Sequence, residues 1–332
     1  MNVDSSTIET AHQRIRQHLI PTPLFVSDAL SERSKATIAI QAEHQQRTGS
    51  FKIRGALNKV LNLNAAERDA GIVTASSGNH GIATATAAQL TDTACTVYLP
   101  ENASKAKINT IQRLGATIVH VASADSYAAE EQARTEANRS GATYVSPYND
   151  PDVVSGQGTL AIDLANNAAR VGLDRIDAVV VAVGGGGLIS GVATWFDRHL
   201  PDAMIVGASP LNDRAMAASV AAGHVIAPAT QPTFSDGTAG SIEPDTMTFE
   251  LCQRLVDTWI DVTEADIAAA VTAMVDDHHQ LVEGAAGVAL AAAQQFGHLH
   301  PGSTVVAVSC GANVTSQTLR QMIETVHQHK LP

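Results

Sequence analysis

The chain has 332 residues, of which 45% are hydrophobic and 16% charged, and this length predicts about two globular domains. Its formal net charge of −12 argues against a nucleic-acid partner, because binding to phosphates requires a basic face. No apolar run approaches about 18 residues, and the three cysteines have neither disulfide nor zinc spacing. We therefore expect a cytoplasmic protein without a membrane span, a signal peptide or a metal site.

Apolar segments rich in β-branched residues alternate with Ala-rich segments along most of the chain. The former predict strands at 36–43, 71–76, 94–100, 116–122, 142–146, 177–184, 203–209 and 303–311. The latter predict helices at 80–90, 104–114, 125–138, 157–170 and 188–199. Alternation of this kind is typical of parallel sheets with helices on both faces.

The strand count predicts an α/β fold with two open, parallel, Rossmann-like sheets. A small domain, 63–146, is expected as an insertion in a large domain made of 1–62 and 147–332, with a cleft between them. The segments 146–156 and 227–245 are rich in Pro, Asp, Gly and Ser, so we expect both to be loops.

The segment RTGSFKIRGA (47–56) places Lys52 where a helix is predicted to begin. A lysine at such a position is either a solvated residue of the first helical turn or a nucleophile held at the helix start. The segment itself leaves both interpretations open.

A second motif, TASSGNHGIATA (74–85), ends a strand and leads through Ser76, Ser77, Gly78 and Asn79 into a helix. Hydroxyl groups and free backbone N–H groups at a helix start suit a carboxylate ligand. The alternative is ordinary capping of the helix by Ser or Asn.

The strongest local signal is VVVAVGGGGLISG (179–191), in which Gly184–Gly187 join a buried strand to a helix. Four glycines let successive N–H groups converge on one anion in front of a helix N-terminus, which favours a phosphate. The dinucleotide pattern G-x-G-x-x-G fails at Ile189 and Ser190, so a small monophosphate fits better than NAD. The alternative is a turn that serves packing alone.

A third strand end, AVSCGANV (307–314), contains Cys310. A buried, inert thiol is the alternative interpretation of this residue. Three strand ends with small polar groups, together with one lysine, nevertheless predict a ligand cleft at the carboxyl ends of parallel strands.

Taken together, TGSFKIRGA, SSGNHG, VGGGGLISG and SCGANV resemble, in order and spacing, the motifs of the fold-type II pyridoxal-phosphate enzymes. Within that group the chain is similar to the threonine/serine dehydratases and serine racemases, over nearly its whole length. The resemblance implies the tryptophan synthase β-like architecture, with pyridoxal 5'-phosphate in the interdomain cleft, and a homodimer.

The resemblance also implies roles for the cofactor residues. Lys52 would form the Schiff base with the cofactor aldehyde and Phe51 would flank the ring. Gly184–Gly187 would hold the phosphate, Asn79 would bond the ring hydroxyl, and Cys310 would face the pyridine nitrogen. A low-dielectric cleft lowers the pKa of a lysine, which frees its amine for attack and for general-base catalysis.

The residues implied for substrate binding are Ser76, Ser77, Gly78, His80, Asp236 and Gly237. Ser77 would lie on the face opposite Lys52 and take part in catalysis. Many relatives bind a divalent cation, but the corresponding places here are Ser209 and Ala215, with Asp213 shifted. We therefore expect no cation site.

The predicted reaction is β-elimination, which converts L-threonine or L-serine to a 2-oxo acid and ammonia. Dehydration of 3-hydroxyaspartate or phenylserine, racemisation at Cα, and a non-catalytic amino-acid sensor remain alternatives. A nicotinamide oxidoreductase is opposed by the failed dinucleotide pattern. The residues after the last predicted strand leave no room for a C-terminal regulatory domain, so we expect none.

Overall fold

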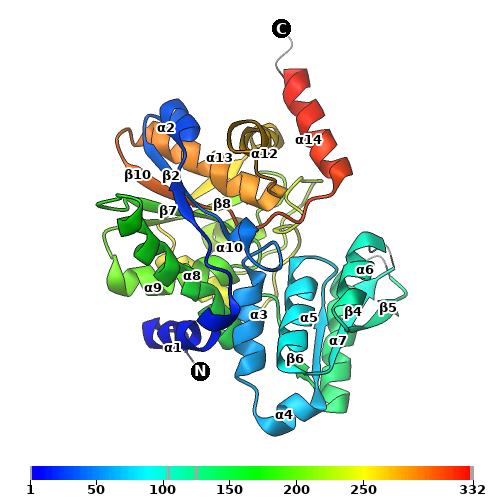
Figure 1. The fold of residues 1–332 in the computed structure, drawn as a ribbon. Coiled ribbons are helices and arrows are strands. Elements are labelled where there is room, and N and C mark those ends of the chain that lie inside the picture. The colour runs from blue at the N-terminus through cyan, green and yellow to red at the C-terminus, as the bar shows by residue number, and fades with distance from the viewer. Residues whose placement is uncertain (1, 102, 104, 124–125, 330–332) are drawn as a thin grey trace.

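The computed structural model describes residues 2–101, 103, 105–123 and 126–329, which form a larger and a smaller β-sheet flanked by helices (Figure 1). Within these residues the larger sheet has six strands in the order β1-β2-β10-β7-β8-β9. Its strands are β1 (Leu24–Val26), β2 (Thr37–Gln41), β7 (Ala178–Ala182), β8 (Met204–Pro210), β9 (Thr258–Val262) and β10 (Thr304–Val308). All neighbouring strands are parallel except β1, which pairs antiparallel with β2 at one edge.

The smaller sheet, counted over the same described residues, has four parallel strands in the order β5-β4-β3-β6. Its strands are β3 (Ile72–Ala75), β4 (Cys95–Pro100), β5 (Thr117–Val121) and β6 (Thr143–Tyr144). In Figure 1 this sheet lies to one side of the larger one, together with α5, α6 and α7. The predicted α/β fold with two parallel sheets is thus confirmed.

The helices connect successive strands and cover the sheets. They are α1 (Ser5–Ile15), α2 (Asp28–Ser34), α3 (Lys52–Leu61), α4 (Ala65–Ala70), α5 (Asn79–Thr91), α6 (Lys105–Arg113), α7 (Ser126–Ser140), α8 (Pro151–Arg170), α9 (Gly187–His199), α10 (Ala215–Ala222), α11 (Met247–Leu255), α12 (Glu264–His278), α13 (Gly284–Leu299) and α14 (Ser316–His329). Short 3-10 turns occupy Arg16–His18 and Glu43–Gln45.

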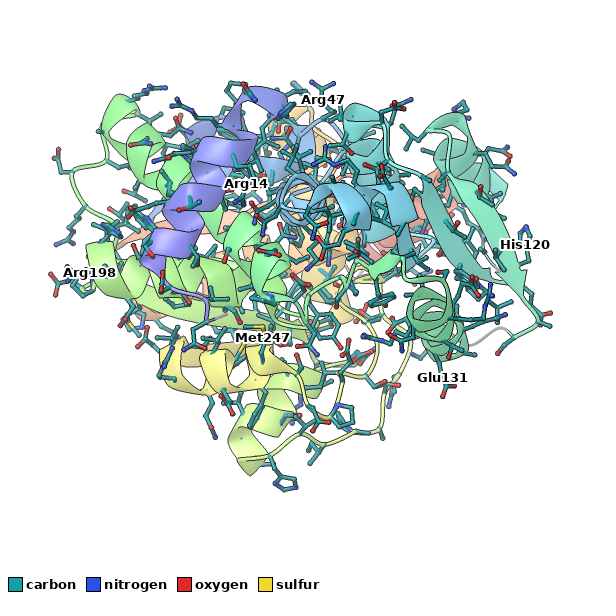
Figure 2. The ribbon with its side chains drawn as sticks, turned by 90° about the horizontal axis from the view of Figure 1, so that it is seen from below. Arg14, Arg47, His120, Glu131, Arg198 and Met247 are labelled. Carbon is teal, nitrogen blue, oxygen red and sulfur yellow. The ribbon has the colours of Figure 1, made fainter. Side chains whose placement is uncertain are left out.

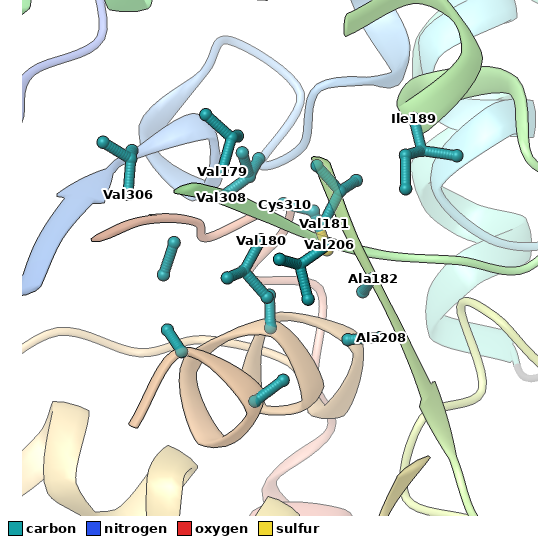
Figure 3. Packing of buried hydrophobic residues seen from close by; sticks show 14 of the residues in the cluster. Val179, Val180, Val181, Ala182, Ile189, Val206, Ala208, Val306, Val308 and Cys310 are labelled. Atoms are coloured by element: carbon teal, nitrogen blue, oxygen red, sulfur yellow. The ribbon is translucent and has the colours of Figure 1, made fainter. Parts of the chain in front are cut away.

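The core of the larger sheet consists mainly of β-branched and small side chains. Val179, Val180 and Val181 of β7 are fully buried because helices cover both faces of the strand. Figure 3 shows these valines packed with Val206 of β8, and Cys310 belongs to the same cluster. The carboxyl end of the sheet is therefore fixed by close packing just where the site begins.

Helix α3 comes after β2 of the larger sheet in the chain, but it packs against the smaller sheet. Ile53 and Leu57 of α3 are fully buried in a cluster that also holds Val97 and Leu99 of β4. Residues before position 63 thus contribute to the core of the smaller sheet. The domain limits at 62/63 and 146/147 stay a prediction.

The main difference from the sequence prediction is the segment 146–156, expected to be a loop. Helix α8 already begins at Pro151, because the Asp150 side chain accepts hydrogen bonds from the N–H groups of Asp152 and Val153 and Pro151 suits the first turn. The prediction was therefore wrong for 151–156, whereas 227–245 contains no helix or strand, as expected. The first residues of the predicted helices 104–114 and 125–138 lie outside the described residues.

Charged side chains lie on the surface of the molecule. Seen from below, the labelled side chains of Arg47, Glu131 and Arg198 point outward, and all three residues are exposed (Figure 2). Among the helices that the structure describes, none combines the length and the apolar character needed to cross a bilayer.

Candidate active site

Lys52 is the first residue of α3, and its Nζ donates a hydrogen bond to the carbonyl of Pro147 at 2.9 Å. The segment before it pairs with the segment after β10. The Phe51 N–H donates to the Cys310 carbonyl at 3.0 Å, and the Ala312 N–H donates to the Gly49 carbonyl at 2.8 Å. This pairing places the lysine beside the carboxyl end of a central strand of the larger sheet.

The environment of Lys52 favours its neutral form. Desolvation lowers its pKa to about 8, although the neighbouring Cys310 and Glu283 oppose part of this effect. An appreciable fraction of the amine is therefore unprotonated near neutral pH, as a nucleophile or a general base requires.

A buried ion-pair network anchors the first turn of α3. Arg54 donates from Nε and Nη2 to the two carboxylate oxygens of Glu43, at 2.7 and 2.8 Å, and from Nη1 to Asp163 at 2.7 Å. The side chains of Arg54 and Glu43 are fully buried. Burial lowers the pKa of Arg54, but the two carboxylates more than reverse this, so the guanidinium stays charged.

The four-glycine turn connects β7 to α9, and its glycines have little room for side chains. Gly186 has a φ of +81°, which favours glycine, and a Cβ on Gly185 would lie 2.4 Å from the ring of Tyr148. The N–H groups in the first turn of a helix have no acceptor within the helix. The turn can therefore bind an anion through its backbone.

The glycine turn and the lysine line the same cavity, which has a volume of about 40 Å³. Its other lining residues include Phe51, Asn79, Glu283 and Cys310. A larger cleft of about 780 Å³ shares Lys52, Asn79 and Glu283 with it. A single ligand can thus place a phosphate group at the turn and a second group within reach of the Lys52 amine.

The polar turn after β3 lines the larger cleft. Asn79 begins α5, and the Gly78 N–H donates to the Ser76 hydroxyl at 3.1 Å. Ser76, Ser77 and Gly78 all contribute to the wall of the cleft beside Lys52. Their hydroxyl and N–H groups can donate to a carboxylate.

His80 lines the same cleft but is buried, and its ring is neutral. Burial lowers its pKa to about 3, helped by the charge of Lys52. Its Nε2 donates to the carbonyl of Val145 at 2.9 Å, which leaves Nδ1 without a proton. A ring in this state has no second N–H to donate, and the expected role of His80 at the substrate carboxylate stays a prediction.

The irregular segment 227–245 borders the cleft from the opposite side. Asp236 and Gly237 line the cleft. Asp236 forms an ion pair with Lys107 of α6 at 3.3 Å. In addition, Glu243 binds Arg134 of α7, so two charged contacts join this segment to helices of the smaller sheet.

Three residues of the site were missed by sequence reasoning. Glu283 and Tyr148 line both cavities, and Asn313 lines the larger one. For Glu283 the usable signal is an acid directly before a run of small residues, VEGAAG, at a helix start. Tyr148 lay in a presumed loop, and only the structure shows its ring against the glycine turn.

The residues considered for a cation lie at the end of β8 and in the segment that follows it. Asp213 is buried, and its Oδ2 accepts a hydrogen bond from the Gly240 N–H at 2.9 Å. Ser209 is buried at the end of β8, and Ala215 begins α10. In the part of the chain that the structure describes, no group of three or more His, Cys, Asp or Glu side chains is arranged for a metal ion.

Comparison with known proteins identifies the ligand class. The family model described as "Pyridoxal-phosphate dependent enzyme" matches residues 15–311. The chain belongs to this family. The residues present fit the cofactor, because the small cavity joins a turn of four glycines at a helix start to an amine with a lowered pKa.

Individual relatives of this pyridoxal-phosphate dependent enzyme carry related names. An L-threonine ammonia-lyase from Thermotoga maritima is 34% identical over 95% of this chain and 77% of its own length. A beta-hydroxyaspartate dehydratase from Paracoccus denitrificans is 33% identical over 92% and 94%. The structure of maize serine racemase superposes with a TM-score of 0.90 at 30% identity, covering 99% of both chains.

If Lys52 is the residue that attaches pyridoxal phosphate, its lowered pKa predicts the pH dependence of that attachment. We expect the rate at which pyridoxal phosphate attaches to the cofactor-free enzyme to rise with pH and to level off above about pH 8, because only the neutral amine attacks. Stopped-flow absorbance between about pH 6.5 and pH 9.5 measures this rate. A rate that still rises without levelling at the upper end of this range, as the ordinary lysine value of 10.5 would give, would contradict the lowered pKa.

Proposed function

We propose that this enzyme converts a small β-hydroxy amino acid, with L-threonine or L-serine as the substrate, to a 2-oxo acid and ammonia. The β-hydroxyl leaves as water, and one water is taken up again when the released imine is hydrolysed. The observation that carries the proposal is the geometry of the cleft. Lys52, the glycine turn and the polar turn at 76–79 line two adjacent cavities that share several residues. The names of the relatives, which include ammonia-lyases and dehydratases, support the same class of reaction.

The cofactor residues have defined roles in this proposal. The backbone of Gly184–Gly187 holds the phosphate, and Phe51 and Asn79 contact the ring. Lys52 carries the cofactor, and Cys310, whose pKa is raised by burial, remains a neutral thiol beside the ring. When bound, pyridoxal phosphate supplies an electron-withdrawing ring that stabilises negative charge at the substrate Cα.

The substrate residues act on either side of the reacting carbon. Ser76, Ser77 and Gly78 bind the substrate carboxylate, and Asp236 and Gly237 border its side chain. The Nζ of Lys52 takes the proton from Cα as general base. The β-hydroxyl leaves as water by taking up the proton that Lys52 removed from Cα, and the hydroxyl of Ser77 serves as the proton carrier on the opposite face.

The test is an assay of the purified enzyme loaded with pyridoxal phosphate. L-Threonine, L-serine, 3-hydroxyaspartate and phenylserine are compared for release of ammonia and 2-oxo acid, and chiral chromatography monitors racemisation. We expect a yellow protein with its highest kcat/KM on L-threonine or L-serine. A colourless protein that takes up no cofactor would instead indicate a non-catalytic amino-acid sensor.

One observation favours 3-hydroxyaspartate as a second candidate. Lys107 lines the larger cleft and can pair with a second carboxylate by exchanging its partner Asp236. If so, Lys107→Ala should lower kcat/KM for 3-hydroxyaspartate by about tenfold, because one charged contact is lost. The kcat/KM for L-threonine should stay unchanged. Equal effects on both substrates would exclude this role.

A further inference from the structure

Glu283 is a buried carboxyl group inside the site that the roles proposed above do not use. It directly precedes α13, is only 3% exposed and lines both cavities. Its backbone N–H donates to the Gly311 carbonyl at 3.0 Å. A Cβ on Gly311 would lie 2.3 Å from Oε1 of Glu283, so the carboxyl group lies directly against the segment that follows Cys310.

The partners of this carboxyl group are neutral amides. The Asn79 Nδ2 donates to both oxygens, at 2.8 and 3.0 Å, and the Asn313 N–H donates to Oε2 at 3.1 Å. Among the described residues, no lysine or arginine forms an ion pair with it. A buried carboxyl group without a cationic partner is costly to keep, which makes a purely structural role a poor explanation.

The Asn79 amide is held from both ends. Its Oδ1 accepts from the Nδ2 of Asn313 at 2.7 Å, and that nitrogen also donates to the Thr48 carbonyl at 3.0 Å. At the other end, the Asn79 Nδ2 faces both oxygens of Glu283. Seen from this nitrogen, the two oxygens lie closer together in angle than the two hydrogens that the nitrogen carries. One hydrogen of Asn79 therefore satisfies Glu283, and the second remains for a ligand in the cavity.

We propose that Glu283 is a positioning residue of the cofactor site, which orients the Asn79 amide so that one of its N–H groups faces the ring hydroxyl of pyridoxal phosphate. This inference rests on the proposed role of Asn79. In its ionised form a carboxyl group only accepts hydrogen bonds, so it fixes the Asn79 N–H toward itself. An amide in its place can also present an N–H and turn the Asn79 amide over.

The charge of Glu283 adds a pH dependence to this arrangement. Burial raises its pKa to about 7, against the lowering effect of the Asn79 hydrogen bond. The other charged or titratable groups that face it are Asp236, Lys107, Lys52 and Cys310. Because Glu283 changes charge near neutral pH, the field at the ring hydroxyl changes with it, and the visible spectrum of the bound cofactor titrates near pH 7.

The decisive variant is Glu283→Gln, studied as the loaded enzyme without substrate. We expect its dissociation constant for pyridoxal phosphate to rise about tenfold. We also expect its visible absorption maximum to shift and the spectral titration near pH 7 to disappear. Glu283→Asp should restore part of the titration. Glu264→Gln is the matched control, because Glu264 also accepts from a backbone N–H, that of Phe234, but is not among the described lining residues.

A second variant keeps the inference testable if Glu283→Gln fails to fold. Asn313→Ala leaves Glu283 intact but removes the donor to Asn79 Oδ1. It should shift the visible absorption maximum in the same direction as Glu283→Gln does. Wild-type spectra and cofactor affinity in either folded variant would overturn the positioning role. Because no substrate is present, these results are independent of the proposed reaction, which fails instead if the loaded wild-type enzyme eliminates no substrate of the panel.

Discussion

Replacing Lys52 with alanine is expected to lower kcat for L-threonine by about 10²–10⁴-fold, the contribution of a positioned general base. The variant loses the amine whose lowered pKa suits proton transfer, but keeps the glycine turn for the phosphate. It should therefore still bind pyridoxal phosphate, without covalent attachment. Release of 2-oxobutyrate measures kcat, and mass spectrometry after borohydride reduction shows whether cofactor is attached to the chain.

Lys59→Ala provides the matched control on the same helix. Lys59 forms ion pairs with Asp150 at 2.7 Å and with Asp152 at 3.3 Å, and does not appear among the described residues that line either cavity. Its loss should leave kcat near the wild-type value and covalent attachment intact. A Lys52→Ala variant within about tenfold of wild type would remove Lys52 from the reaction.

Replacing Arg54 with methionine is expected to lower the free energy of unfolding by about 3–5 kcal/mol, the range for breaking a buried ion pair. The reason is that Glu43, whose side chain is fully buried, would lose both of its hydrogen bonds to the guanidinium. Urea denaturation followed by circular dichroism measures the change.

The double variant Glu43→Gln/Arg54→Met separates charge from packing. It no longer buries an unpaired carboxylate, so it should be more stable than Arg54→Met alone. If both variants lose the same stability, the loss comes from the shape of the arginine side chain, and the electrostatic explanation is wrong.

The sequence predicted those parts of the fold and site that depend on local signals. A run such as VVVAV can only be a buried strand here, and four consecutive glycines before a helix define the turn by themselves. Strands β1 and β9 were missed because both lie at edges of the larger sheet, where strands are short or partly polar and lack a continuous apolar pattern.

The remaining parts of the site depend on contacts between distant segments. Glu283 and Asn79 are 204 positions apart, so no local pattern links the carboxyl group to the amide that it binds. The pKa of Lys52 likewise depends on desolvation by the assembled cleft. The start of α8 was missed for another reason, since its capping residues, Asp150 and Pro151, also occur in turns.

The place of β10 in the sheet order determines when this site comes into existence during synthesis. β10 lies between β2 and β7, so the larger sheet remains in two unjoined halves until residues 304–308 have left the ribosome. Until then Lys52, which is translated early, has no contact with Cys310 or Gly311. The small cavity that Lys52 and Cys310 line can therefore form only after nearly the whole chain has been translated, so cofactor binding follows synthesis of the polypeptide.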